Sequence, residues 1–221
     1  MAAEDEHFFN TIHQYLVSQS RRGEKMDTEN MLAKRFQVSR YRIRQVLDQL
    51  SQMGVLERAQ KRGMSLTEVK PDVLARNVYN QLAVNCFDVR EYLEARLSLM
   101  EGTIGLSVTR MTPVLLSRLD QTVQQLQGCI EVHAAALKLH SAFQRTLIEA
   151  SGNRVIQVLA YALLENWYNL LETSTLDTAF FSTALDSDRA ILKAVKVGDS
   201  EEAKKLLTSL LRSEMLYLIS H

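Results

Sequence analysis

Cysteine and proline are scarce in this 221-residue sequence, which has two residues of each. Cys86 and Cys129 are too few and too irregularly spaced for a disulfide framework or a thiolate metal site, so each is predicted to be buried apolar filler. Pro71 stands where the apolar spacing becomes helical and then stays helical. It therefore marks a predicted boundary between two domains, residues 1–70 and 71–221.

Long apolar runs are also missing, and none approaches the roughly 20 residues that cross a bilayer. The first residues, MAAEDEHFF, are acidic and lack the basic-then-apolar order of a signal peptide. We therefore expect a cytoplasmic protein, and its 46% hydrophobic content supports two real cores. No glycine-rich phosphate loop, paired carboxylates of distinctive context or nucleophile beside a histidine is found, so no enzymatic activity is predicted.

The formal net charge is zero, but the charges are segregated. Residues 34–62 contain eight Lys or Arg and two acids, a local charge of +6. From Asp72 onward, acidic residues outnumber basic ones. A basic module of this size is typical of contact with nucleic-acid phosphates, and it predicts an affinity that falls steeply with salt.

The stretch VSRYRIRQVLDQL, residues 38–50, predicts an amphipathic helix with Ser39 as its N-cap and Gly54 as its end. Three arginines lie near its positive end, where the helix dipole disfavours each by roughly 0.3–1 kcal/mol. A solvated charged face is the simpler interpretation. A DNA-recognition helix is the sharper one, because such a helix meets phosphates and base edges with its first residues. The predicted apolar face consists of Ile43, Val46, Leu47, Leu50 and Met53.

The context favours recognition of DNA. A second short helix over 27–36 precedes it, separated by only QVS, and a third is predicted within residues 6–19. Two short runs flank QKRG downstream, with Gly63 at the hairpin tip. The predicted fold is therefore mostly α: an N-terminal winged helix-turn-helix, followed by an all-α antiparallel helical bundle of six or seven helices.

Three helices of the predicted bundle each carry a polar residue on an apolar face: Arg90, His140 and Asp188. An internal network, such as Arg90 paired with Asp188, explains any one of them. Together they indicate a pocket for a polar ligand, with Arg90 as a bidentate carboxylate anchor. His140 and Gln144 would orient the ligand's other polar groups. Trp167 is a candidate aromatic wall, although it and His133 are also explained as core residues.

The segment LAKRFQVSRYRIRQVLDQLSQMGVLERAQKRGMSL resembles the DNA-binding domain of the GntR superfamily of bacterial transcription regulators, and the likeness spans roughly residues 8–69. By this resemblance Arg40, Arg44, Arg62 and Gly63 map onto DNA-contacting positions. The sequence departs from the family at Gln37, where a glycine is usual, and inside the recognition helix. The full set of predicted DNA-binding residues is Arg35, Arg40, Tyr41, Arg42, Arg44, Gln45, Lys61, Arg62 and Gly63.

The second half is similar to the FCD domain, the ligand-sensing domain of the FadR-type branch, through VREYLEARLSLMEG, HSAFQRTLIEASGN and SDRAILKAVKVGDSEEA. That resemblance implies a divalent metal inside the bundle. Its ligand positions map onto His140, Gln144, Asp188 and Leu210. Only two of these are ordinary donors where Zn²⁺ needs at least three, so we expect no metal cofactor.

These features predict a ligand-responsive repressor that binds a palindromic operator in double-stranded DNA as a homodimer. Its effector is predicted to be a small organic acid that binds in the C-terminal bundle. The predicted effector-binding residues are Arg90, His140, Gln144, Trp167 and Asp188. Two alternatives stay open: the same architecture sensing a fatty acyl thioester, and an architectural DNA-binding protein without an effector.

Overall fold

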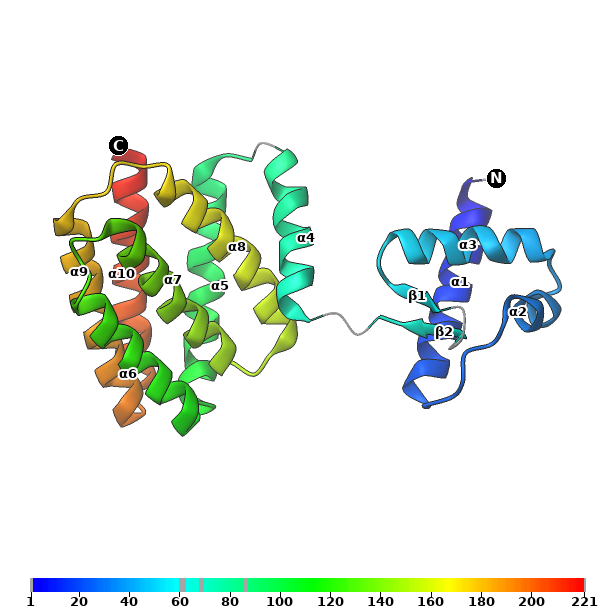
Figure 1. Ribbon diagram of the computed structural model, residues 1–221, viewed down its shortest axis with the longest axis horizontal. Coiled ribbons are helices and arrows are strands. Elements are labelled where there is room, and N and C mark those ends of the chain that lie inside the picture. Colours follow the sequence, from blue (N-terminus) through cyan, green and yellow to red (C-terminus); the bar gives the residue numbers. More distant parts are fainter. Residues whose placement is uncertain (1, 60–62, 68–69, 86, 221) are drawn as a thin grey trace. The chain divides into compact units, whose positions relative to one another are not determined.

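The computed structural model describes residues 2–59, 63–67, 70–85 and 87–220. The chain divides into two compact units, Met1–Val69 and Lys70–His221, and each unit has its own hydrophobic core. Helices dominate both units, and the strands that the structure describes pair in one two-stranded sheet of the first unit (Figure 1). The predicted mostly-α fold class is therefore confirmed.

The first unit is a winged helix-turn-helix. Its helices are α1 (Ala2–Arg21), α2 (Glu29–Phe36) and α3 (Arg40–Gln52). Strands β1 (Leu56–Ala59) and β2 (Gly63–Leu66) follow as an antiparallel hairpin, in which Leu56 pairs with Leu66 and Ala59 with Gly63. α3 packs against α2 and β1, and α1 against α3 and β2.

Local chemistry explains the helix ends. The Thr28 hydroxyl caps α2 by accepting from the Met31 N–H, and the Ser39 hydroxyl caps α3 by accepting from the Arg42 N–H. Between them Gln37 has φ 54°, the only non-glycine with positive φ among the described residues. This left-handed residue ends α2 and turns the chain into α3, at the position where the superfamily that the sequence resembles usually has glycine.

The predicted apolar face of α3 is confirmed at Ile43, Val46, Leu47 and Leu50, all of which are buried. Met53 departs from it, because α3 ends at Gln52 and the Met53 side chain is 63% exposed. The α3 side chains pack on those of α1 and α2, so the first unit's core fixes which face of α3 stays open. The core residues from α1 and α2 are Ile12, Leu16, Leu32 and Ala33.

The described residues of the second unit form helices and the loops that join them. Its seven helices are α4 (Pro71–Val84), α5 (Val89–Thr109), α6 (Pro113–Gln127), α7 (His133–Ala150), α8 (Arg154–Glu172), α9 (Thr178–Val197) and α10 (Ser200–Ser220). Pro71 and Pro113 each open a helix, where the missing N–H costs nothing. No helix among the described residues is long and apolar enough to cross a membrane.

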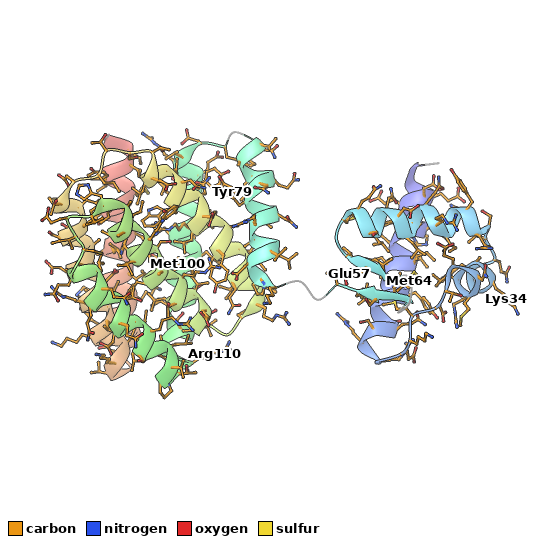
Figure 2. All side chains as sticks on the ribbon, in the orientation of Figure 1. Lys34, Glu57, Met64, Tyr79, Met100 and Arg110 are labelled. Carbon is orange, nitrogen blue, oxygen red and sulfur yellow. The ribbon has the colours of Figure 1, made fainter. Side chains whose placement is uncertain are left out.

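Helix α5 lies inside the second unit, where it packs against α7, α8 and α10. Figure 2 shows Met100 of α5 among the helices of this unit, while Lys34 of α2 extends from the surface of the first unit. α4 packs against α8, and α9 joins α6, α7 and α10. The middle turns of α5, α7, α9 and α10 therefore face one shared interior.

Candidate functional sites

The exposed face of α3 carries four of the predicted DNA-binding residues: Arg40, Tyr41, Arg44 and Gln45. Tyr41 is 71% exposed, and its hydroxyl accepts a hydrogen bond from the Gln45 amide at 3.1 Å. No acidic residue occupies the first turn of α3. The helix therefore presents donors and positive charge at its N-terminus, as a major-groove reading helix does.

Arg40 and Arg44 share one carboxylate, that of Glu29 in the first turn of α2. The Arg44 guanidinium donates to Glu29 through Nε at 3.4 Å and Nη2 at 2.9 Å, and Arg40 Nη2 lies 3.9 Å away. Both arginines remain more than half exposed. The exposed face of α3 with Arg40, Tyr41, Arg44 and Gln45 is called the reading face below. Glu29 thus holds the two guanidinium groups on one side of it.

Arg42 does not share that face. Its guanidinium stacks 4.4 Å from the centroid of the Phe8 ring and pairs with Asp5 at 3.0 Å, so it links α3 to α1. The Arg42 side chain is nevertheless 36% exposed and lines a surface hollow together with Gln45, so its contact with DNA stays a prediction.

Arg35 occupies the last turn of α2. Its guanidinium lies 4.9 Å from the centroid of the Tyr15 ring and 3.4 Å from Asp27, yet the side chain stays 55% exposed. Gly63 begins β2. Lys61 and Arg62, the predicted basic wing tip, lie outside the described residues.

A buried polar cluster lies inside the second unit. The ring of His140 on α7 sits between two carboxylates: Nδ1 donates to Asp188 of α9 and Nε2 donates to Glu214 of α10, each at 2.7 Å. All three side chains are at most 1% exposed. Burial of charge at this depth demands pairing, and the cluster supplies it.

Arg96 of α5 and Gln144 of α7 complete the cluster. Arg96 Nη1 donates to Glu214 at 2.9 Å, and its Nη2 donates to the Gln144 carbonyl oxygen. The Gln144 amide nitrogen donates to Glu214 at 3.2 Å. Glu214 therefore accepts hydrogen bonds from three side chains on two other helices.

Trp167 of α8 forms one wall of the cluster. Its ring meets the His140 ring edge-on with centroids 5.7 Å apart, and the Arg96 guanidinium stacks 4.3 Å from its centroid. Two buried atoms here have no hydrogen-bond partner, the indole Nε1 of Trp167 and Oδ1 of Asp188. The predicted grouping of Trp167 with His140, Gln144 and Asp188 is thus present in space.

The charges of the cluster follow from its pairing. Burial alone lowers the pKa of His140, but Asp188 and Glu214 outweigh it and raise this pKa to about 10. Burial raises the pKa of Asp188 to about 6, against the attraction of His140. Burial opposes ionisation of Glu214, but Arg96 and His140 keep its pKa below the usual value. At neutral pH two cations therefore face two anions.

Arg90, the predicted carboxylate anchor, does not join the cluster. It lies in the first turn of α5 with an exposed side chain, and its N–H donates to the Asp88 cap at 2.7 Å. The buried arginine is Arg96, which lies on the α5 face of Leu93 and Met100. Arg90 shares the helical spacing of Leu93 and Leu97, but Leu97 is only half-buried, so this spacing pointed to the wrong arginine.

Glu214 was missed by the sequence reasoning. It follows Leu207, Leu210 and Leu211 at helical spacing, so an acid on an apolar stripe was the available signal. His133 lies outside the cluster: its Nε2 is 3.3 Å from the Thr178 hydroxyl and its ring packs on Phe181. That contact agrees with its interpretation as a core residue.

A divalent metal does not fit these donors. Both ring nitrogens of His140 are already engaged, Nδ1 with Asp188 and Nε2 with Glu214, each at 2.7 Å. Gln144 already bridges Arg96 and Glu214, and Leu210, buried on α10, supplies no donor. Within the described ranges no group of three or more His, Cys, Asp or Glu side chains is arranged to hold a metal ion.

The cluster is also closed. A small hollow lies beside Arg96 and Gln144 and is lined further by residues of α5, α7 and α8. It has no room for a water molecule (≈ 0 Å³). The expected ligand cavity at these residues is therefore filled by the chain itself. A ligand that enters this hollow to reach Arg96 has to displace a side chain.

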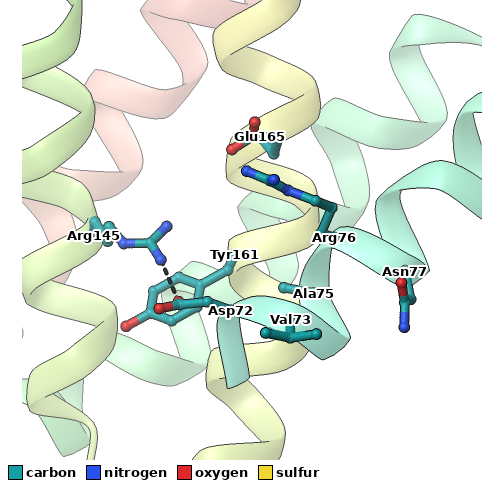
Figure 3. Close-up of a pocket in the computed structure, with 8 residues that line it drawn as sticks. All are labelled: Asp72, Val73, Ala75, Arg76, Asn77, Arg145, Tyr161 and Glu165. Carbon is teal, nitrogen blue, oxygen red and sulfur yellow. Dashed lines mark hydrogen bonds and ion pairs between the residues drawn. The ribbon is translucent and has the colours of Figure 1, made fainter. Parts of the chain in front are cut away.

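A separate, open cavity of ≈ 360 Å³ lies between α4, α7 and α8 (Figure 3). Asp72 pairs with Arg145, whose guanidinium lies 4.1 Å from the centroid of the Tyr161 ring. Burial raises the pKa of Tyr161 to about 12. Arg76 and Glu165 line the other side. Two cations face two acids in this cavity, so it offers a carboxylate no net attraction.

Comparison with known proteins places both units. The family of bacterial regulatory proteins called gntR matches residues 10–66, and the FCD domain matches residues 91–213. The HTH-type transcriptional regulator LutR of Bacillus subtilis is 31% identical over 138 residues, 62% of this chain and 63% of that protein. The uncharacterized HTH-type regulator YcbG of B. subtilis is 24% identical over 154 residues, 69% of this chain and 64% of that protein.

These two matches span less than two thirds of the length of either relative. Among solved structures, Streptococcus agalactiae GntR has the same fold, with a TM-score of 0.67 and 22% identity. That alignment covers 94% of this chain and 98% of the S. agalactiae chain.

Proposed function

Because the chain belongs to the gntR family of bacterial transcription regulators with an FCD effector-binding domain, we propose that it is a ligand-responsive repressor. It binds a palindromic operator as a homodimer in the bacterial cytoplasm, and it does no chemistry on its effector. Its operator affinity is set by a small organic acid that binds in the C-terminal bundle.

The convergence of Arg96, His140 and Gln144 on one carboxylate supports the choice of effector class. Two cationic groups and an amide that donate hydrogen bonds to the same position recognise a carboxylate both by its charge and by hydrogen-bond geometry. The cluster's paired charges are a poor environment for the apolar tail of an acyl thioester. A small acid is therefore the better match than a fatty acyl thioester.

The size of the DNA-reading surface supports the proposed homodimer. One α3 helix reads a short DNA segment, and two-fold symmetry doubles the contacts while it adds specificity. Effector binding that favours one placement of the two DNA-binding units would change operator affinity. By linkage, the operator would then change effector affinity by the same factor.

The experiment selects binding sequences from a pool of random DNA duplexes and then measures affinity against salt concentration. We expect a palindromic site, two chains per duplex, and Arg40→Ala and Arg44→Ala each weakening binding by roughly 10–100-fold with a salt slope shallower by about one. Arg189→Ala, an exposed arginine of the second unit, is the matched control. Unchanged affinity and slope in both α3 variants would refute this role for α3.

The effector class is tested by adding a panel of small carboxylates to the protein–operator complex. Release of the operator by one acid, with recovery of that acid unaltered, supports the proposal. Turnover of the acid would show an enzyme instead. Failure of every metabolite to shift either thermal stability or operator affinity would favour an architectural DNA-binding protein.

A further inference from the structure

We propose that Glu214 is a built-in carboxylate that occupies the effector's position, so that a small carboxylate binds by displacing it and freeing α10. This inference rests on the proposed function, because it assigns the effector a place and a competitor. The ligand class is a monocarboxylate or one carboxylate group of a larger acid. The receptor for it, Arg96, His140 and Gln144, is already assembled.

The geometry shows a receptor with its ligand in place. Glu214 accepts from Arg96 through Oε2 at 2.9 Å and from His140 through Oε1 at 2.7 Å. The Gln144 amide adds a third donor to Oε1 at 3.2 Å. Both oxygens are thus used as a free carboxylate would use them, and none of the three donors comes from α10 itself.

The charge balance favours an anion once Glu214 leaves. Arg96 and His140 then supply two positive charges, and Asp188, hydrogen-bonded to the far side of His140, supplies one negative charge. The vacated position would face a net charge of about +1 at low dielectric, where an unpaired charge is costly. Exchange of one carboxylate for another keeps every donor satisfied, so it avoids that cost.

The lack of free space makes displacement necessary. The hollow beside Arg96 and Gln144 holds no water-sized volume, so an acid cannot enter there unless a side chain moves. Glu214 belongs to α10, which packs against α5 and α9. Thr208 links α10 to Glu101 at 3.0 Å, and Tyr217 links it to the Thr175 carbonyl at 2.7 Å. Loss of the Glu214 contacts would therefore change how α10 is held against α5.

The test uses the full chain with Glu214→Ala, because this change removes a CH₂–COO⁻ group that acetate matches in size and charge. Thermal unfolding is measured in sodium acetate and in sodium chloride of equal ionic strength, with acetamide as the neutral isostere. In about 50 mM acetate we expect the variant's Tm to rise by about 5 °C over chloride. Acetamide should do less, and the wild type should not respond.

A second variant isolates the receptor. Arg96→Met with Glu214→Ala should lose the acetate response, because the guanidinium that donates to the carboxylate is gone. If Glu214→Ala does not fold in chloride, refolding yield from urea in acetate, chloride and acetamide makes the same comparison. Equal behaviour in acetate and chloride, by Tm or by refolding yield, would overturn the proposal.

The two proposals fail in different ways. If an acid releases wild-type protein from the operator but acetate does not stabilise Glu214→Ala, the effector binds elsewhere and the role of Glu214 is wrong. If acetate stabilises the variant but does not change its operator affinity, the carboxylate receptor is supported while the proposed regulation by it fails. The acetate measurement needs no DNA, so the second outcome is separable from a fault in DNA binding.

Discussion

The Nε2 atom of His140 lies 2.7 Å from Oε1 of Glu214, a residue 74 positions later in the chain, and both side chains are buried. This hydrogen bond joins α7 to α10, and Arg96 joins the same carboxylate to α5. The interior of the sensing domain therefore depends on charge pairing as well as on apolar packing. Stability and effector response are expected to share these residues.

Arg96→Met should destabilise the second unit by about 3–5 kcal/mol, because it leaves a buried Glu214 without its guanidinium partner. Arg90→Met, a matched change in the exposed first turn of the same helix, should stay within about 0.5 kcal/mol. Urea unfolding measures both. The double variant Arg96→Met with Glu214→Leu should lose less than Arg96→Met alone, and equal losses for Arg90→Met and Arg96→Met would contradict the pairing.

Stability of the second unit should fall as pH rises from about 6.5 to 10. The pKa of His140 is raised to about 10 in the folded state, from about 6.5 in an unfolded chain. The folded protein therefore holds a proton that the unfolded chain releases, and the loss is up to about 1.4 kcal/mol per pH unit in this window.

The pH measurement combines urea unfolding with NMR titration of the His140 ring. His133→Asn is the control, because His133 lies outside the cluster, and it should keep the full slope. A His140 ring signal that titrates near pH 6.5 would show that the two carboxylates do not hold its proton.

Gln37→Gly should stabilise the first unit by about 0.5–1 kcal/mol. The left-handed conformation costs an L-residue about 1–2 kcal/mol, and the larger unfolded-state entropy of glycine offsets part of that gain. Gln49→Gly, at an exposed position inside α3, should instead cost about 1 kcal/mol. The denaturant midpoint of each variant measures its stability. If both substitutions shifted the midpoint in the same direction, the backbone strain assigned to Gln37 would be wrong.

Glu29→Gln should raise affinity for non-operator DNA by about twofold to fivefold, because it frees Arg40 and Arg44 from an exposed ion pair. Discrimination between operator and other sequences should fall, since Glu29 also orients the Arg44 guanidinium. Glu24→Gln, an acid paired with Arg22 in the same unit, is the control. Fluorescence anisotropy with labelled duplexes measures both affinities. A lower affinity of Glu29→Gln for non-operator DNA would contradict this prediction.

Much of the DNA-binding unit is determined by local sequence. Thr28 and Ser39 cap their helices, Gly54 follows the end of α3, and the apolar spacing of α3 selects its buried face. Each of these signals acts within one turn of helix, so it can be read without the fold. The same holds for Pro71 and Pro113, which begin α4 and α6.

Only part of the buried cluster could be predicted from the sequence. His140, Gln144 and Asp188 stood out because polar residues on apolar stripes are conspicuous. Arg96 and Glu214 are residue types that usually stay exposed. Their burial is stable only because they meet each other, at positions 118 residues apart, with His140 and Gln144 beside them.

The sequence by itself determined the helices, their caps, the basic reading face and the family. The tertiary structure decided which arginine faces inward, which carboxylate it meets, and that the Arg42 guanidinium lies over the Phe8 ring. The physical reason is the distance along the chain over which each interaction acts. Capping and periodicity depend on residues close together in sequence. The pairing of buried charges depends on which helices meet and on how each helix is rotated about its axis. That long-range pairing is what gathers separate polar residues into one buried cluster around the Glu214 carboxylate.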